Sequence, residues 1–306
     1  MNYIDILAEN LKLPAGKIKN TVALLQADNT VPFIARYRKE ITGGLDEQQI
    51  LAIKDELKRL ENLEDRRQTI LQSILTQGKL SDSLKDQILA ATNLTALEDL
   101  YLPYRPKRRT RAMIAREKGL EPLAKMIIEQ PVTDEPLSKL VQPFINESVP
   151  DQQSALSGAS DIVAESVSEN AAIRQCVRDK GLRFGSLTSE KMPDQEDTHT
   201  TYSLYYQFTQ RINQLHPHQI LAINRGEREN ILKVGISIPD RDWLTAIHQQ
   251  FPTKQGSVFY ETLSTSIEDS AKRLLLPAIE RDIRRTLTEN AELHAIQVFA
   301  RNLQGL

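Results

Sequence analysis

The most distinctive local composition in the chain lies between Leu100 and Pro122. From Arg105 to Lys118 there are seven basic side chains and a single acid, although the whole chain carries a net charge of −2. Lysine and arginine at this density can neutralise phosphates and release their counterions, and arginine can donate two hydrogen bonds to one phosphate group. We therefore predict contacts to RNA or DNA phosphates, without sequence readout, by four residues: Lys107, Arg108, Arg109 and Arg111.

Aromatic residues and a second, smaller basic patch could extend such a surface. Tyr101 and Tyr104 flank a proline turn beside the basic run and are candidates for stacking on bases. The second patch is formed by Arg36, Arg38 and Lys39. A competing interpretation stays open, in which the arginines pair with acidic helices of the same chain and the tyrosines belong to the core.

Residues that could do catalytic or metal chemistry are few. The sequence lacks G-x-S-x-G, G-x-x-x-x-G-K-[ST] and G-x-G-x-x-G. His216 and His218 are the only histidines close in sequence, and an extended chain through Pro217 would place their rings on opposite sides, as in a solvated loop. Carboxylate pairs such as Asp55/Glu56 stand beside lysines and arginines and indicate helix-surface ion pairs. We therefore predict a non-enzymatic chain with no metal and no cofactor.

The elements around the basic run follow from its prolines and glycine. Pro103 and Pro106 predict a non-helical segment over 102–106. Two short helices are expected after the run, over 113–118 and 120–129, hinged at Gly119. This pair resembles a helix-turn-helix, a motif that more often serves packing than DNA reading.

A long amphipathic helix is predicted over Asp46–Gln77, where apolar residues recur at three- and four-residue steps. Gly78 is expected to end it. We favour a role in the core of a helical bundle, with a lever between modules as the alternative.

The second half of the chain is less regular. The segment from Gly185 to Asp197 is polar and without periodicity, which indicates a boundary. A β-hairpin is predicted from runs at 219–224 and 230–238, joined by Arg225–Glu229. Helix should then return, with a kink at Pro277. The predicted divisions are a multihelical domain over 1–184, a mixed segment over 185–265 and a helical segment over 266–306.

Composition supports a mainly α fold, with a multihelical N-terminal region and a small mixed segment. Of the 306 residues 40% are hydrophobic and only 5% aromatic. Cys176 is the single cysteine, so a disulfide framework is excluded and a reducing, cytoplasmic compartment is favoured. No signal peptide or membrane-spanning run is recognisable.

Two long strings carry a resemblance to a known family. LYLPYRPKRRTRAMIAREKGLEPLA at Leu100–Ala124 and VPFIARYRKEITGGLDE at Val31–Glu47 resemble the N-terminal region of the Tex family of bacterial transcription accessory proteins. The family more often has alanine at Ile41, lysine at Arg105 and threonine at Met113, differences that leave the charge pattern intact.

This resemblance implies a helical scaffold that supports nonspecific RNA or DNA binding in transcription. It further implies that RNase-H-like (YqgF-type), helix-hairpin-helix and OB-type domains follow Leu306 in a longer protein and are partners of this region. Nuclease carboxylates would then lie outside this chain. The alternative is a protein-interaction scaffold that docks to the transcription or translation machinery without touching nucleic acid.

Overall fold

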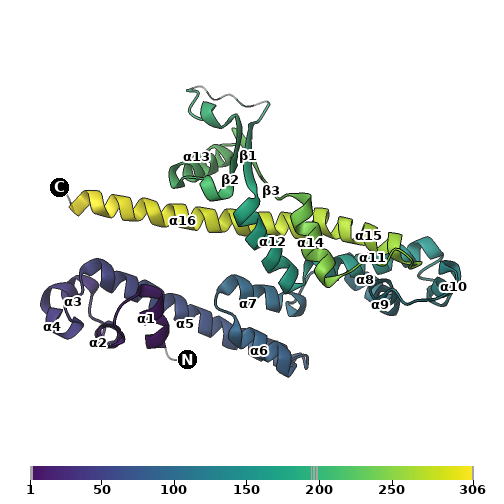
Figure 1. The fold of residues 1–306 in the computed structure, drawn as a ribbon, viewed down its shortest axis with the longest axis horizontal. Coiled ribbons are helices and arrows are strands. Elements are labelled where there is room, and N and C mark those ends of the chain that lie inside the picture. The colour runs from purple at the N-terminus through teal and green to yellow at the C-terminus, as the bar shows by residue number, and fades with distance from the viewer. Residues whose placement is uncertain (1–2, 194, 196, 198, 305–306) are drawn as a thin grey trace. The chain divides into compact units, whose positions relative to one another are not determined.

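The computed structural model describes residues 3–193, 195, 197 and 199–304 (Figure 1). The chain separates into two compact units, residues 1–101 and 102–306. The mainly α fold is confirmed in both units, and the division into 1–184, 185–265 and 266–306 stays a prediction. Among the described helices, none has a stretch long and apolar enough to cross a membrane.

The first unit is entirely helical in its described part. Its helices are α1 (Tyr3–Leu11), α2 (Ala15–Gln26), α3 (Val31–Tyr37), α4 (Lys39–Thr42), α5 (Glu47–Thr76), α6 (Asp82–Ala90) and α7 (Leu94–Tyr101). The predicted long helix is confirmed as α5. Asp46 begins it with a capping box, in which its carboxylate accepts from the Gln49 amide at 2.7 Å and the Gln49 side chain accepts from the Asp46 amide at 3.1 Å. Gly78, at φ 67°, follows its end.

The apolar stripe of α5 is covered along its whole length. Its first half packs against α1, α2 and α3, and its second half against α6 and α7. Ile50, Ile53, Ile70 and Ile74 are fully buried. The predicted role of this helix in a bundle core is therefore confirmed.

One position in the stripe is a buried arginine. Arg67 is 1% exposed, and its Nε and Nη2 donate to the carbonyls of Ile88 and Ala91 at 3.2 and 2.8 Å. Its Nη1 also donates to Glu64. The guanidinium thereby gives the last carbonyls of α6 and its C-cap a charged donor; the Ile88 carbonyl also accepts from the Ala91 amide at 3.4 Å.

The second unit is also mainly helical and contains one small sheet. Its elements are η1 (Leu102–Tyr104), α8 (Arg111–Glu117), α9 (Glu121–Glu129), α10 (Leu137–Val141), η2 (Gln142–Phe144), α11 (Gln152–Ser168), α12 (Ala171–Phe184), β1 (Ser186–Lys191), η3 (Ser203–Tyr205), β2 (Gln207–Arg211), η4 (Ile212–Gln214), α13 (Pro217–Arg228), β3 (Leu232–Ser237), α14 (Asp240–Gln250), α15 (Tyr260–Asp269), the π-helix η5 (Ser270–Leu275) and α16 (Leu276–Gln304).

Helix α11 is the centre of this unit. It packs against α8, α9 and α10 and also against α15 and η5. Small buried residues such as Ala155 and Ala159 let these neighbours approach closely. At Gly158, a Cβ atom would lie 2.5 Å from Cδ1 of Leu120, so this glycine is required by the contact.

The predicted hairpin over 219–238 is wrong in its first strand. Residues 219–224 lie inside α13, where Ile220 and Ile223 share the buried face and Pro217 occupies the first turn. The apolar residues of this run fit both a strand and a short helix, and the tertiary packing decides for helix. The second run does form a strand, β3, but its partner is β1.

The sheet has the strand order β2-β1-β3, and both pairings are antiparallel. Thus β1 lies in the polar segment that was predicted as a boundary. Its buried positions are Leu187 and Ser189, and this weak alternation explains why periodicity did not reveal it.

In place of the kink predicted at Pro277, the structure has a π-helix just before this proline. The π-helix η5 runs directly into α16, and Pro277 is the second residue of α16. The proline, which has no N–H to donate, therefore stands where the helical hydrogen-bond pattern changes. Helices α15 and α16 run on in one direction through this π-helix (Figure 1).

Candidate nucleic-acid interface

The predicted basic run is fixed to α11 by Lys107, Thr110 and Arg116. After η1 the chain passes without regular structure to Thr110, whose hydroxyl accepts from the Met113 amide at 3.1 Å and so begins α8. The same hydroxyl donates to Glu165 of α11 at 3.1 Å. Thr110 therefore connects the start of α8 to the central helix.

Two acidic side chains next to this junction hold the basic residues. Nζ of Lys107 lies 2.5 Å from Glu169 and 3.5 Å from Glu165, and Nη1 of Arg116 lies 2.6 Å from Glu165. All four side chains are at least half-buried. Internal pairing, the competing interpretation, is thus realised for Lys107 and Arg116.

The two carboxylates respond differently to this environment. Burial by itself would raise the pKa of Glu165, but the hydrogen bond from Arg116, the charges of Lys107 and Arg116 and the Thr110 hydroxyl together lower it. Burial dominates at Glu169 and raises its pKa, because Lys107 is its main cation and the charge of Glu165 opposes ionisation. We take Glu165 as the ionised anchor of the cluster.

Other cations of the run point to solvent. Four are exposed and, within the part of the chain that the structure describes, have no carboxylate within 4 Å: Arg105, Arg108, Arg111 and Lys118. One of them acts weakly on an acid: the pKa of Asp269 is lowered mainly by its hydrogen bond from Arg273 and to a small extent by the charge of Arg111. We call these four residues the outer cations.

Arg109 is intermediate between the two groups. It pairs with Glu117 at 2.7 Å, but both side chains are more than half exposed, so solvent screens the pair and it contributes little stability. Such a pair can open to let the arginine meet a phosphate.

The helices after the run are confirmed as predicted. Helices α8 and α9 are separated by Gly119, which adopts φ 79°. Ala112, Ala115 and Leu123 are buried, and both helices pack on α11. The pair therefore serves packing, and the exposed side of α8 carries Arg111.

The two candidate tyrosines lie in different settings. Tyr101 is 8% exposed, its hydroxyl lies 3.0 Å from that of Ser73, and the Arg66 guanidinium covers its ring at 5.5 Å. It is a core side chain of the first unit, with little ring surface left for a base. Tyr104 begins the second unit and is half-buried.

The second basic patch belongs to the first unit. Arg36, Arg38 and Lys39 are all exposed on α3 and at the start of α4. The sequence prediction missed two aromatic neighbours, Phe33 and Tyr37, which are 36% and 67% exposed. Their four-residue spacing beside three cations is the sequence signal that could have pointed to them.

The histidine pair differs from its prediction. The rings of His216 and His218 lie on the same side and stack at 5.6 Å with an interplanar angle of 8°. The extended geometry assumed for Pro217 does not occur, because this proline starts α13. No group of three or more histidine, cysteine or carboxylate side chains suited to a metal occurs among the described residues.

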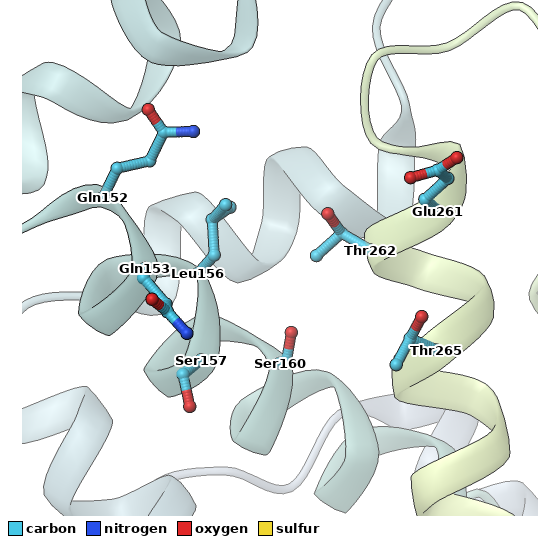
Figure 2. A pocket seen from close by; sticks show the side chains of 8 residues that line it. All are labelled: Gln152, Gln153, Leu156, Ser157, Ser160, Glu261, Thr262 and Thr265. Carbon is cyan, nitrogen blue, oxygen red and sulfur yellow. The ribbon is translucent and has the colours of Figure 1, made fainter.

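A groove with a volume of about 490 Å³ lies between α11 and α15 (Figure 2). Ser160 and Leu156 face Thr262 and Thr265 across it, with Glu261 at one end (Figure 2). The lining contains an acid and no base, so it does not suit a phosphate backbone.

Comparison with known sequences identifies the family. Residues 1–75 match the family described as "Tex-like protein N-terminal domain", and residues 133–299, more than half of the chain, match "Tex central region-like". The chain belongs to the Tex family. The resemblance inferred from the two strings is thereby confirmed, and the basic run lies between the two matched ranges.

Similar proteins from bacteria and a mammal extend well beyond this chain. "Uncharacterized protein YdcI" of Bacillus subtilis is 39% identical over 98% of this chain and 42% of its own length. "Transcriptional accessory protein Tex" of Neisseria gonorrhoeae is 38% identical over 100% of this chain and 41% of its own. "S1 RNA-binding domain-containing protein 1" of Pongo abelii is 30% identical over 100% of this chain and 32% of its own. The Tex region described above therefore spans less than half the length of these relatives.

Proposed function

We propose that this region is a non-catalytic helical scaffold that contacts RNA or DNA phosphates in transcription, without reading sequence. One observation carries the proposal. Lys107 and Arg116 pair with Glu165 and Glu169, whereas the outer cations are exposed and, among the described residues, have no carboxylate within 4 Å. The names of the gonococcal and orangutan relatives, which refer to transcription and to RNA binding, support the same direction.

The spacing of the outer cations suits a backbone contact. Arg111 and Lys118 are seven residues apart at the two ends of α8, which places them on one side of the helix about 10 Å apart. Arg108 and Arg105 continue the basic surface along the preceding non-helical segment. Charges so placed can follow a phosphate backbone without reaching base edges.

Salt-dependent binding tests the proposal. Fluorescence anisotropy with single-stranded RNA, single-stranded DNA and duplex DNA would be measured from low to moderate salt. We expect affinity to fall with salt, and we expect an Arg105→Ala/Arg108→Ala/Arg111→Ala variant to lower the log–log slope by about two to three units.

A matched variant controls for net charge. Lys125→Ala/Lys139→Ala/Lys272→Ala removes the same number of charges from exposed lysines that pair with glutamates one turn away. This control should keep the wild-type slope. Equal slopes for all three proteins, or no binding at low salt, would overturn the proposed contact.

A protein-docking scaffold is the second candidate, favoured by one feature of α16. Leu293, Ile296 and Phe299 recur at three-residue steps and are 59–65% exposed. Such an apolar side on a helix is typical of contact with another protein surface. Failure of the chain to bind nucleic acid would favour the protein-docking scaffold over the phosphate contact. Metal-dependent cleavage of RNA or DNA by the chain would overturn the non-catalytic assignment.

A further inference from the structure

The exposed side of α3 carries two solvent-exposed aromatic rings, those of Phe33 and Tyr37. Val31, Ile34 and Ala35 form the buried side of this short helix. Phe33 and Tyr37 project from the opposite side, one turn apart. Tyr37 is 67% exposed, so its ring buries little area in the fold.

The two rings and an arginine form a connected surface. The ring centroids of Phe33 and Tyr37 are 5.3 Å apart at an interplanar angle of 42°. The Arg38 guanidinium lies 5.2 Å from the Phe33 centroid, within the range of a cation–π contact. Ile41, 45% exposed, adds an apolar edge from α4.

The backbone that carries this surface is held from α2. Nζ of Lys17 donates to the carbonyl of Gly43 at 2.7 Å, and the Asn20 amide donates to the carbonyl of Ile41 at 2.8 Å. Gly43 ends α4 at φ 69°, a conformation that favours glycine. These bonds fix α4 and its apolar Ile41, whereas the two rings are carried by α3, whose backbone is held by its buried side.

Charge around the rings is mainly positive. Between Val31 and Leu45 there are three cations, Arg36, Arg38 and Lys39, and one acid, Glu40. All of these are exposed. A ligand that suits this surface must offer flat π faces to the rings and negative charge to the cations.

We propose that Phe33 and Tyr37 are a stacking platform for bases of single-stranded nucleic acid, with Arg36, Arg38 and Lys39 holding the adjacent phosphates. Unpaired bases offer π faces to aromatic side chains, whereas bases in a duplex are already stacked on each other. An acidic peptide would satisfy the cations but would not use two exposed rings. The platform lies in the first unit, so it does not depend on the outer cations of the second.

The test compares oligonucleotides with and without bases. Ten-residue oligouridine and oligothymidine would be titrated against the full chain, together with an abasic oligomer that has the same number of phosphates. We expect Tyr37→Ala to weaken binding of the base-containing oligomers about tenfold, in the range for loss of one stacked base, and to leave the abasic oligomer unaffected. Tyr37→Phe keeps a ring and should retain wild-type binding.

Controls separate this site from the basic run and from misfolding. The Arg105→Ala/Arg108→Ala/Arg111→Ala variant should lower the salt slope without changing the ratio of intact to abasic binding. Because Tyr37 is largely exposed, Tyr37→Ala should unfold at the wild-type temperature. Photocrosslinking with 5-iodouridine should place an adduct on Phe33 or Tyr37.

Three results would overturn the platform. One is equal binding of both oligomer types by wild type and Tyr37→Ala. Another is an equal loss for intact and abasic oligomers, which would assign Tyr37 to another role. The third is Tyr37-dependent binding of an acidic peptide with no such dependence for nucleic acid, which would mark the surface as a protein contact.

Discussion

Replacement of Arg67 by methionine should strongly destabilise the first unit. Methionine keeps the apolar stem of the side chain and removes only the guanidinium. The carbonyls of Ile88 and Ala91 then lose a charged donor, and Glu64 loses its cation. Hydrogen bonds to a charged group contribute about 1.5–3 kcal/mol each, and breaking a buried pair costs about 3–5 kcal/mol. These contributions overlap, so we expect a loss of about 3–5 kcal/mol.

Urea denaturation can locate this loss in the first unit. Trp243 is the only tryptophan and lies in the second unit, so its fluorescence reports there, whereas circular dichroism reports helices of both. With a slope of about 2 kcal/mol per molar, we expect the dichroism transition of the first unit to move by about 2 M. The fluorescence transition should stay in place.

The neighbouring arginine supplies the control. Arg66 pairs with Glu98, but the two side chains are 36% and 40% exposed, so Arg66→Met should cost less than about 1 kcal/mol. If Arg67→Met costs no more than Arg66→Met, the reasoning from burial is refuted.

Three further predictions concern the second unit. Gly158→Ala should destabilise it by about 1–3 kcal/mol in thermal unfolding, because the new methyl group meets the buried Leu120. The control is Gly16→Ala in the first unit, which has open space around it and should be neutral or stabilising. Equal effects of the two substitutions would contradict this prediction. Glu165→Gln should lower the free energy of unfolding at pH 7, and the difference from wild type should vanish as pH falls below 4.5 through the depressed pKa of Glu165. Glu169→Gln should cost less at pH 7, because the raised pKa of Glu169 already disfavours its ionised form; a larger loss than for Glu165→Gln would count against the assignment.

Long periodic helices could be predicted from sequence because their patterns are local. The stripe and caps of α5 and the glycine between α8 and α9 needed no tertiary information. The small sheet could not be predicted correctly because its pairing is not local. β1 is polar, and β1 and β3 are paired across more than 40 residues, so neither strand identifies its partner locally.

The sequence could predict where the basic residues of the candidate interface lie in the chain, but not which of them face solvent. Seven basic residues in a short run do not say which of them have partners. That division depends on Glu165 and Glu169, which are about 60 residues away in sequence. Arg67 is a different case, because its position continues the three- and four-residue steps of the stripe between Leu63 and Ile70. Its charge, read as solvated, hid a burial that the spacing indicates.

The central position of α11 has a consequence for how the chain folds as it is synthesised. The first unit is complete once Tyr101 has emerged from the ribosome. Helix α11, in contrast, is covered on one side by α15 and η5, so its core cannot close before Leu275 has been made. At about 5–20 residues per second, roughly 10–35 s separate the two events. In the later part of that time, after Ser168 has been made, the apolar side of α11 is open. The nascent chain should then be a preferred target for chaperones that bind exposed hydrophobic helices.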